Sequence, residues 1–172
     1  YQRISAVYGD TLNLNKSILN KAQFEITQKR KCTPGELGCA ESHRLAWKDI
    51  ISSGASFGLI LEDDVKLPGH FDSLIDSIDG DPTFDIINLS STGTYPITSK
   101  KINRLLNLNI CERPYMKGRK YWRRIEAGSW KIFSLKQLGC ITLCECAVLP
   151  PLASGYIVSL KACKELLKVS EN

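Results

Sequence analysis

Histidine is scarce in this chain, and long apolar runs are missing. Only two histidines occur among the 172 residues. No hydrophobic stretch approaches the roughly 20 residues that a membrane-spanning helix needs, and the residues after Tyr1 lack the layout of a signal peptide. The sequence also holds no internal repeat and no low-complexity tract. These absences exclude a membrane-spanning helix and a repeat array within the chain.

The composition is that of an ordinary globular protein. Hydrophobic residues make up 43% and charged residues 24% of the chain. The length predicts a single domain over residues 1–172 that is large enough to bury a core.

Seven cysteines are many, and an odd number cannot all pair within one monomer. Cys39 and Cys163 fall in helical patterns and are predicted to be small buried hydrophobes. Cys140, Cys144 and Cys146 cluster, but their spacing is not that of paired zinc knuckles and neither histidine is near. Reduced thiols in a cytoplasm are therefore the favoured interpretation, with zinc binding as the lesser alternative.

The segment Phe57–Val65, FGLILEDDV, joins a short apolar run to three carboxylates. The run predicts a buried strand. Glu62, Asp63 and Asp64 at its end favour a hard divalent cation such as Mg²⁺ or Mn²⁺, which shares oxygen ligands with substrate phosphates. On a straight strand Glu62 and Asp64 share one face, so they are the predicted metal ligands, with Asp63 beside them at the nucleotide. The alternative is a loop that binds no metal.

A helix is predicted immediately before this strand, between Thr33 and Gly54. Thr33 suits the N-cap, Pro34 suits the first helical position, Glu36 completes a capping box, and Gly54 suits the C-terminal stop. One face of the helix collects an inward stripe, which consists of Glu36, Ala40, His43, Trp47 and Ile50. His43 is thus either packed in the core or presented to a ligand, and Glu36 is either a cap or a ligand contact.

The remaining pattern alternates helices and strands. Strands are expected at 2–7, 84–90, 131–135 and 141–146, and helices at 14–29, 69–79 and 160–169, the last capped by Ser159. This alternation predicts an α/β fold with a mostly parallel central sheet and helices outside it. Asn88 and Ser90 end the strand at 84–90, where they are candidate contacts to a nucleotide.

Four sequence blocks resemble glycosyltransferase family 25, the lipopolysaccharide and lipooligosaccharide glycosyltransferases, which also include the collagen galactosyltransferases. The first two are GELGCAESHRLAWKDI at Gly35–Ile50 and LILEDDV at Leu59–Val65. Weaker matches are SGYIVSLKACKELL at Ser154–Leu167 and RISAVYGD at Arg3–Asp10. Against the family's usual extent, the chain is expected to be incomplete at both ends.

The resemblance implies a GT-A-like, Rossmann-like nucleotide-sugar-binding fold. It also implies an inverting transfer of a hexose, galactose or glucose, from a UDP-sugar to a lipooligosaccharide acceptor, with Mn²⁺ or Mg²⁺ as cofactor. His43 and Asp64 are then the candidate catalytic residues. The candidate substrate contacts are Glu36, Ser42, Gly155 and Tyr156. The alternative is a non-catalytic member of the same fold that binds carbohydrate or nucleotide.

Residues 100–131 form a basic stretch with ten Lys or Arg and only two acids. It is either a solvated loop or a cradle for an acidic lipooligosaccharide, in which Arg119 and Arg123 are the candidate contacts. Nucleic acid is not an expected partner, because no RNA- or DNA-binding motif accompanies the charge. The expected location is the cytoplasm, with peripheral contact to the inner face of the inner membrane.

Overall fold

The computed structural model describes residues 2–12, 21–69, 71–79, 83–89, 102–103, 106–107, 132–138, 141–146 and 154–170. Contacts between Cα atoms group the chain into two units, which are described separately. The first comprises Tyr1–Leu61, Phe84–Ile87 and Gly155–Asn172, and the second comprises Glu62–Thr83 and Asn88–Ser154. The single domain over residues 1–172 stays a prediction.

Helix α2 (Pro34–Ser53) is the longest element of the first unit, and its ends are built as the sequence predicts. The Thr33 side chain accepts the Glu36 N–H, and the Glu36 carboxylate accepts the Thr33 N–H at 2.9 Å, which completes the capping box. Pro34 opens the helix. Gly54 ends it with φ +70°, a left-handed conformation that a Cβ would strain. The predicted helix and both of its caps are confirmed.

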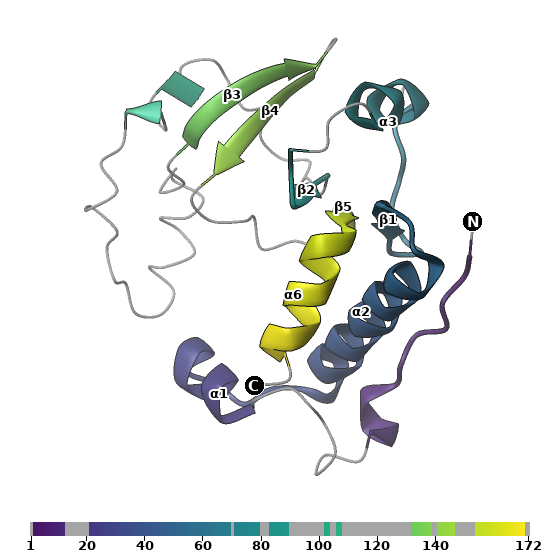
Figure 1. The fold of residues 1–172 in the computed structure, drawn as a ribbon. Coiled ribbons are helices and arrows are strands. Elements are labelled where there is room, and N and C mark those ends of the chain that lie inside the picture. Colours follow the sequence, from purple (N-terminus) through teal and green to yellow (C-terminus); the bar gives the residue numbers. More distant parts are fainter. Residues whose placement is uncertain are drawn as a thin grey trace. The chain divides into compact units, whose positions relative to one another are not determined.

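The first unit contains a sheet of three strands in the order β1-β5-β2 (Figure 1). The strands are β1 (Phe57–Leu61), β2 (Ile86–Asn88) and β5 (Gly155–Ser159). β1 and β5 are antiparallel, with Phe57 opposite Ser159 and Leu61 opposite Gly155. Every residue of the central strand β5 is buried. β5, which comes last of the three strands in the sequence, is therefore the central strand of the sheet.

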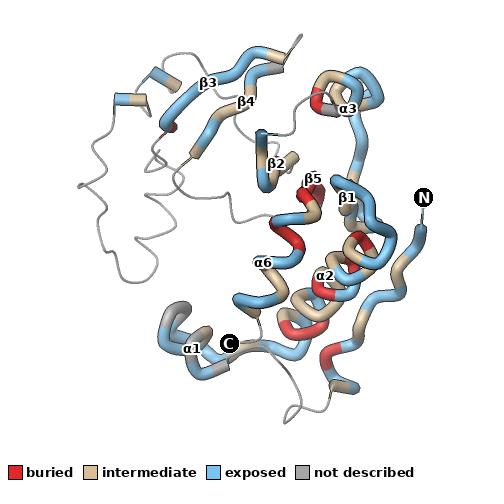
Figure 2. Tube along the Cα trace, in the orientation of Figure 1, coloured by how far each residue is buried: buried red, intermediate tan, exposed pale blue. Residues whose placement is uncertain are grey.

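Helix α2 and a second helix, α6 (Leu160–Ser170), pack side by side and both contact this sheet (Figure 1). Helix α6 follows β5 directly, and the Ser159 hydroxyl caps it by accepting the Ala162 N–H at 3.0 Å. Buried residues line β5 and one side of α2 (Figure 2). The buried core cluster is Ile50, Tyr156, Val158, Ala162 and Cys163, with Trp47, Ile51, Ile60, Ile86 and Leu166 packed against it. The predicted burial of Cys163 is thereby confirmed.

The expectation of a GT-A-like fold with a mostly parallel, Rossmann-like central sheet is wrong. The structure is mixed α/β with small antiparallel sheets: β1 pairs antiparallel with β5, and in the second unit β3 (Ile132–Leu138) pairs antiparallel with β4 (Ile141–Cys146). A buried strand has the same continuous apolar sequence whether its neighbours in the sheet are parallel or antiparallel to it. The apolar pattern of β1 and β5 therefore does not tell that these two strands, which are distant in the sequence, pair in the antiparallel direction.

The other predicted elements are confirmed only in part. Helix α3 (Phe71–Asp79) and the β3–β4 pair lie where they were expected, and α1 (Lys21–Gln28) covers the described end of the helix predicted at 14–29. The strand predicted at 2–7 is wrong, since none of those described residues is in a strand. A short 3₁₀ turn, η1 (Gly9–Thr11), follows instead.

Strand β1 is less buried than its apolar sequence predicts. Leu59 is 41% exposed and Leu61 is 37% exposed. Leu59 and Leu61 are two residues apart and therefore point to the same face of the sheet, whereas Ile60 points to the other face and packs against the core cluster. None of the helices within the described ranges is both long and apolar enough to cross a bilayer.

Candidate functional site

Two side chains of α2, His43 and Trp47, meet at the hydroxyl of Tyr156 in β5. His43 and Trp47 are four residues apart on α2, so they share one face of the helix. The Trp47 indole N–H donates to the Tyr156 hydroxyl at 2.9 Å, and His43 Nδ1 lies 2.9 Å from the same oxygen. The His43 and Tyr156 rings are tilted at 38°, with centroids 5.5 Å apart. Tyr156 is only 6% exposed, whereas His43 is half-buried, so the hydroxyl is an internal support for the imidazole.

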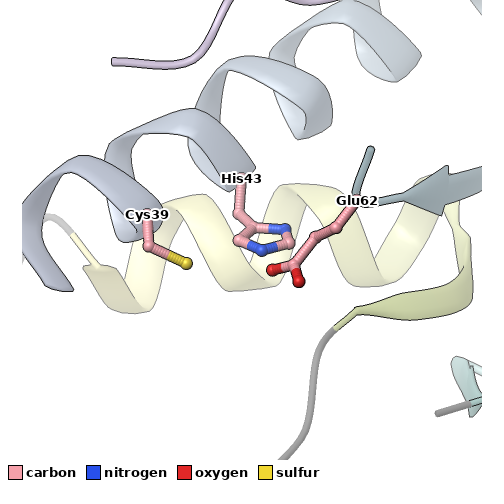
Figure 3. Close-up of side chains that lie close together, drawn as sticks. All are labelled: Cys39, His43 and Glu62. Carbon is pink, nitrogen blue, oxygen red and sulfur yellow. The ribbon is translucent and has the colours of Figure 1, made fainter. Parts of the chain in front are cut away.

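Glu62 follows the last residue of β1 and continues the strand pairing by one hydrogen bond, from its N–H to the Ser154 carbonyl at 2.8 Å. Figure 3 shows its carboxylate beside the imidazole of His43, with the thiol of Cys39 on the preceding turn of α2. One possible ligand atom from each of these three residues lies within 4.8 Å of the other two. Glu62 is half-buried, and Cys39 is exposed.

The acidic triplet is not held on a straight strand. β1 ends at Leu61, and Asp63 and Asp64 lie in a turn in which the Val65 N–H approaches the Glu62 carbonyl at 3.4 Å. Both aspartates are exposed. A shared face for Glu62 and Asp64 therefore does not follow from strand geometry. The turn offers exposed carboxylate oxygens beside a half-buried one, and the metal role of these residues stays a prediction.

The Glu36 carboxylate is engaged at the start of α2. Besides the Thr33 N–H, it accepts Arg30 Nη1 at 2.8 Å, and a second, shorter contact joins Arg30 Nη2 to its other oxygen. The hydrogen bond from the Arg30 guanidinium, followed by that from the Thr33 backbone, lowers the pKa of Glu36 from 4.5 to about 2. The Glu36 carboxylate, which was predicted to contact the substrate, is thus hydrogen-bonded to the Thr33 N–H of the helix cap and paired with Arg30.

Because the folded state lowers the Glu36 pKa, this carboxylate stabilises the fold above its unfolded pKa of 4.5 and loses that effect as the pH falls toward about 2. The pair is exposed, so solvent screens it and its contribution to stability is small. Urea unfolding of wild type should show the loss between about pH 5 and pH 2. Glu36→Gln should remove this part of the pH dependence, whereas Glu165→Gln, on an exposed position of α6, should retain it. Equal pH curves for wild type and Glu36→Gln would contradict the assignment.

The other predicted contacts are placed as follows. The Ser42 hydroxyl accepts the Val7 N–H at 2.9 Å and donates to the Gly38 carbonyl at 2.7 Å, so it ties the N-terminal segment to α2. Gly155 pairs with Leu61, and Asn88 is the half-buried last residue of β2. Ser90, Arg119 and Arg123 lie outside the described residues.

The structure thus brings together three of the predicted residues, His43, Glu62 and Tyr156, and adds two that the sequence analysis did not assign to the site. Trp47 was predicted only to lie on the inward stripe of the helix. Cys39 was predicted to be buried, which is wrong, because it is exposed beside His43. The spacing of Cys39, His43 and Trp47 at four-residue steps was the available signal, since such residues line one face of a helix.

Comparison with known proteins gives the family. No curated protein and no solved structure matches the chain. The sequence model described as glycosyltransferase family 25 (LPS biosynthesis protein) matches residues 1–172, which is the whole chain. The resemblance read from the sequence blocks is therefore confirmed: the chain belongs to glycosyltransferase family 25 and is a glycosyltransferase.

Proposed function

We propose that this glycosyltransferase is an inverting hexosyltransferase that moves galactose or glucose from a UDP-sugar to a lipooligosaccharide acceptor. The observation that supports the proposal is the meeting of His43 and Tyr156 beside Glu62. These residues come from three separate blocks of the sequence that carry the family resemblance. Titratable groups gathered by distant segments are typical of a reaction centre.

The proposed reaction is a single displacement at the anomeric carbon. An acceptor hydroxyl oxygen forms the new bond to this carbon as the bond from the carbon to the β-phosphate oxygen of UDP breaks. The hydroxyl proton passes to a general base, and negative charge builds on the departing diphosphate. Groups that donate hydrogen bonds or carry positive charge at the diphosphate therefore accelerate the step.

We assign the divalent cation, Mn²⁺ or Mg²⁺, to the acidic turn. The donor set fits a hard ion, because Glu62 and Asp64 offer carboxylate oxygens within one turn and Asp64 is exposed to solvent. The Cys39 thiol is a soft ligand and is not part of this set. When bound, such an ion supplies Lewis-acid stabilisation of the diphosphate charge. Asp63, exposed in the same turn, is proposed to contact the nucleotide.

The remaining assignments extend from this centre. Asn88 and Ser90, at and just after the end of β2, are proposed to bind the nucleotide. Arg119 and Arg123, in the basic stretch, are proposed to bind the acidic groups of the acceptor. We place the enzyme in the cytoplasm, with peripheral contact to the inner membrane where lipid-linked acceptors lie, and we propose no nucleic-acid partner.

The proposal is tested by assaying the purified chain against a panel of UDP-sugars with Mn²⁺ and lipooligosaccharide. We expect UDP release to depend on the acceptor and to be fastest with UDP-galactose or UDP-glucose. A product with inverted anomeric configuration, identified by NMR, would support a single displacement. UDP binding measured by calorimetry without turnover of any sugar would instead favour the non-catalytic alternative.

A further inference from the structure

Cys39, His43 and Glu62 form a cluster that the proposed reaction uses only in part. Figure 3 shows the imidazole of His43 between the Cys39 thiol and the Glu62 carboxylate. A possible ligand atom of each residue lies within 4.8 Å of those of the other two. The hard cation assigned to Glu62 and Asp64 has no use for a thiol, because such ions prefer oxygen ligands. The cluster therefore offers a different metal chemistry at the same carboxylate.

Two of the three ligands come from one turn of helix α2. Cys39 and His43 are four residues apart, so their side chains share one face of the helix, as the two histidines of a helical zinc motif do. Glu62 directly follows β1, and the hydrogen bond from its N–H to the Ser154 carbonyl extends the strand pairing to this residue. A helix and the end of a strand thus present the thiol, the imidazole and the carboxylate to one point.

The Tyr156 hydroxyl orients the imidazole for metal binding. It lies 2.9 Å from His43 Nδ1 and also accepts the Trp47 indole N–H at 2.9 Å. Metal-bound histidines commonly make such a bond through the nitrogen that does not hold the metal, which fixes the ring. With the ion on Nε2, Nδ1 carries the proton and donates it, and the two lone pairs of the Tyr156 oxygen accept both bonds.

We propose that Cys39 Sγ, His43 Nε2 and a Glu62 carboxylate oxygen bind Zn²⁺, and that this ion inhibits the transferase. Zinc is bound by thiolate, imidazole and carboxylate together, and the thiol loses its proton as the metal binds. Tetrahedral bonds of about 2.0–2.3 Å place ligand atoms about 3.3–3.6 Å apart, so the side chains need to close by only about 1 Å.

The site does not need any of these groups to lack a partner beforehand. A metal ion takes the place of the protons through which such side chains bond to one another. Three protein ligands leave the fourth position of the ion to water. Cys39 is exposed, so the ion can reach the cluster from solvent. An open site of this kind suits reversible binding.

The inhibition rests on the proposed function, because it depends on the roles given there to Glu62 and His43. Zn²⁺ at the cluster withdraws the Glu62 carboxylate from the hard cation and His43 from the reacting groups. Mn²⁺ gains little from the thiol, whereas Zn²⁺ binds it well. Zinc and manganese are therefore expected to compete, and Cys39 gives zinc its advantage at this cluster.

The metal site can be tested without an activity assay, with Co²⁺ as a spectroscopic probe for Zn²⁺. Under reducing conditions, the metal-free chain should give a thiolate-to-cobalt absorption band that added Zn²⁺ abolishes. Cys39→Ser should lose the band and bind Zn²⁺ about a hundredfold more weakly or worse, since even outer partners of metal ligands contribute about 10–100-fold. Glu62→Gln should also weaken Zn²⁺ binding. The control Cys144→Ser, on β4, should keep both properties. A band that persists in Cys39→Ser, or that Cys144→Ser removes, would overturn the site.

The competition is measured with the best UDP-sugar, each protein being compared with its own rates in the absence of zinc. At about ten times its Kd, Zn²⁺ should raise the Mn²⁺ concentration for half-maximal activity about tenfold in wild type, and the same Zn²⁺ concentration should raise it less than about twofold in Cys39→Ser. Equal inhibition of the two proteins would overturn the competition at this cluster. If wild type turns over no UDP-sugar, the proposed function fails, and the cobalt spectra still decide the metal site.

Discussion

Asp64→Asn is expected to lower kcat/KM by about a hundredfold or more while changing the free energy of unfolding by less than about 0.5 kcal/mol. Asp64 is exposed in the turn after β1, so its carboxylate contributes little to packing. If it holds the cation, the amide removes a charged ligand and the diphosphate loses part of its stabilisation. Steady-state kinetics with the best UDP-sugar and urea unfolding measure the two quantities separately.

The matched control is Asp72→Asn, which removes an exposed carboxylate from the first turn of α3. It should leave kcat/KM within about twofold of wild type, since surface substitutions away from a site have small effects. Wild type should also lose activity in excess EDTA and regain it with added Mn²⁺. Full activity in EDTA would contradict the metal role, and a fully active Asp64→Asn would contradict the role of this residue.

Gly38→Ala is expected to destabilise the fold by about 1–3 kcal/mol or more. A Cβ at this position of α2 would lie 2.3 Å from the Val7 carbonyl oxygen and 2.9 Å from the Gly9 nitrogen. Both are backbone atoms, so neither can rotate away as the end of a side chain can. The methyl group would push the N-terminal segment off α2 and disturb the bond between Val7 and Ser42. Thermal and urea unfolding should both report the loss.

Gly35→Ala provides the control on the same helix. A Cβ at Gly35 meets no atom within 4 Å, and alanine is the better helix former. We expect Gly35→Ala to be neutral or slightly stabilising. If the two variants unfolded alike, the close approach of residues 7–9 to α2 would be contradicted.

The local elements could be predicted because their signals lie within a few residues of one another. The Thr33 and Glu36 capping box and the Gly54 stop specified both ends of α2, and Ser159 specified the start of α6. Each of these interactions spans at most three residues, so the sequence contains it in full. The strand pair β3–β4 was predictable for the same reason, since its strands are joined by a short connection.

The sheet could not be predicted in the same way. β1 and β5 lie about a hundred residues apart in the sequence, and an apolar run does not tell which partner it pairs with or in which direction. The candidate site shares this difficulty. His43 and Tyr156 were each found from the family blocks, but their hydrogen bond joins residues 113 positions apart. The roles proposed for Ser90, Arg119 and Arg123 remain predictions from the sequence.

The antiparallel pairing of β1 and β5 also has a consequence for the order of folding during synthesis. While the ribosome makes the chain, β1 emerges long before β5, the central strand to which it is hydrogen-bonded. Most of the core cluster comes from residues 156–163, so the side of α2 that carries Trp47 and Ile50 lacks most of its packing partners until they are made. Contacts this distant in sequence close slowly, because the intervening chain must lose its freedom first. A nascent chain halted before Gly155 should therefore expose the apolar sides of α2 and β1 and depend on chaperones to stay in solution.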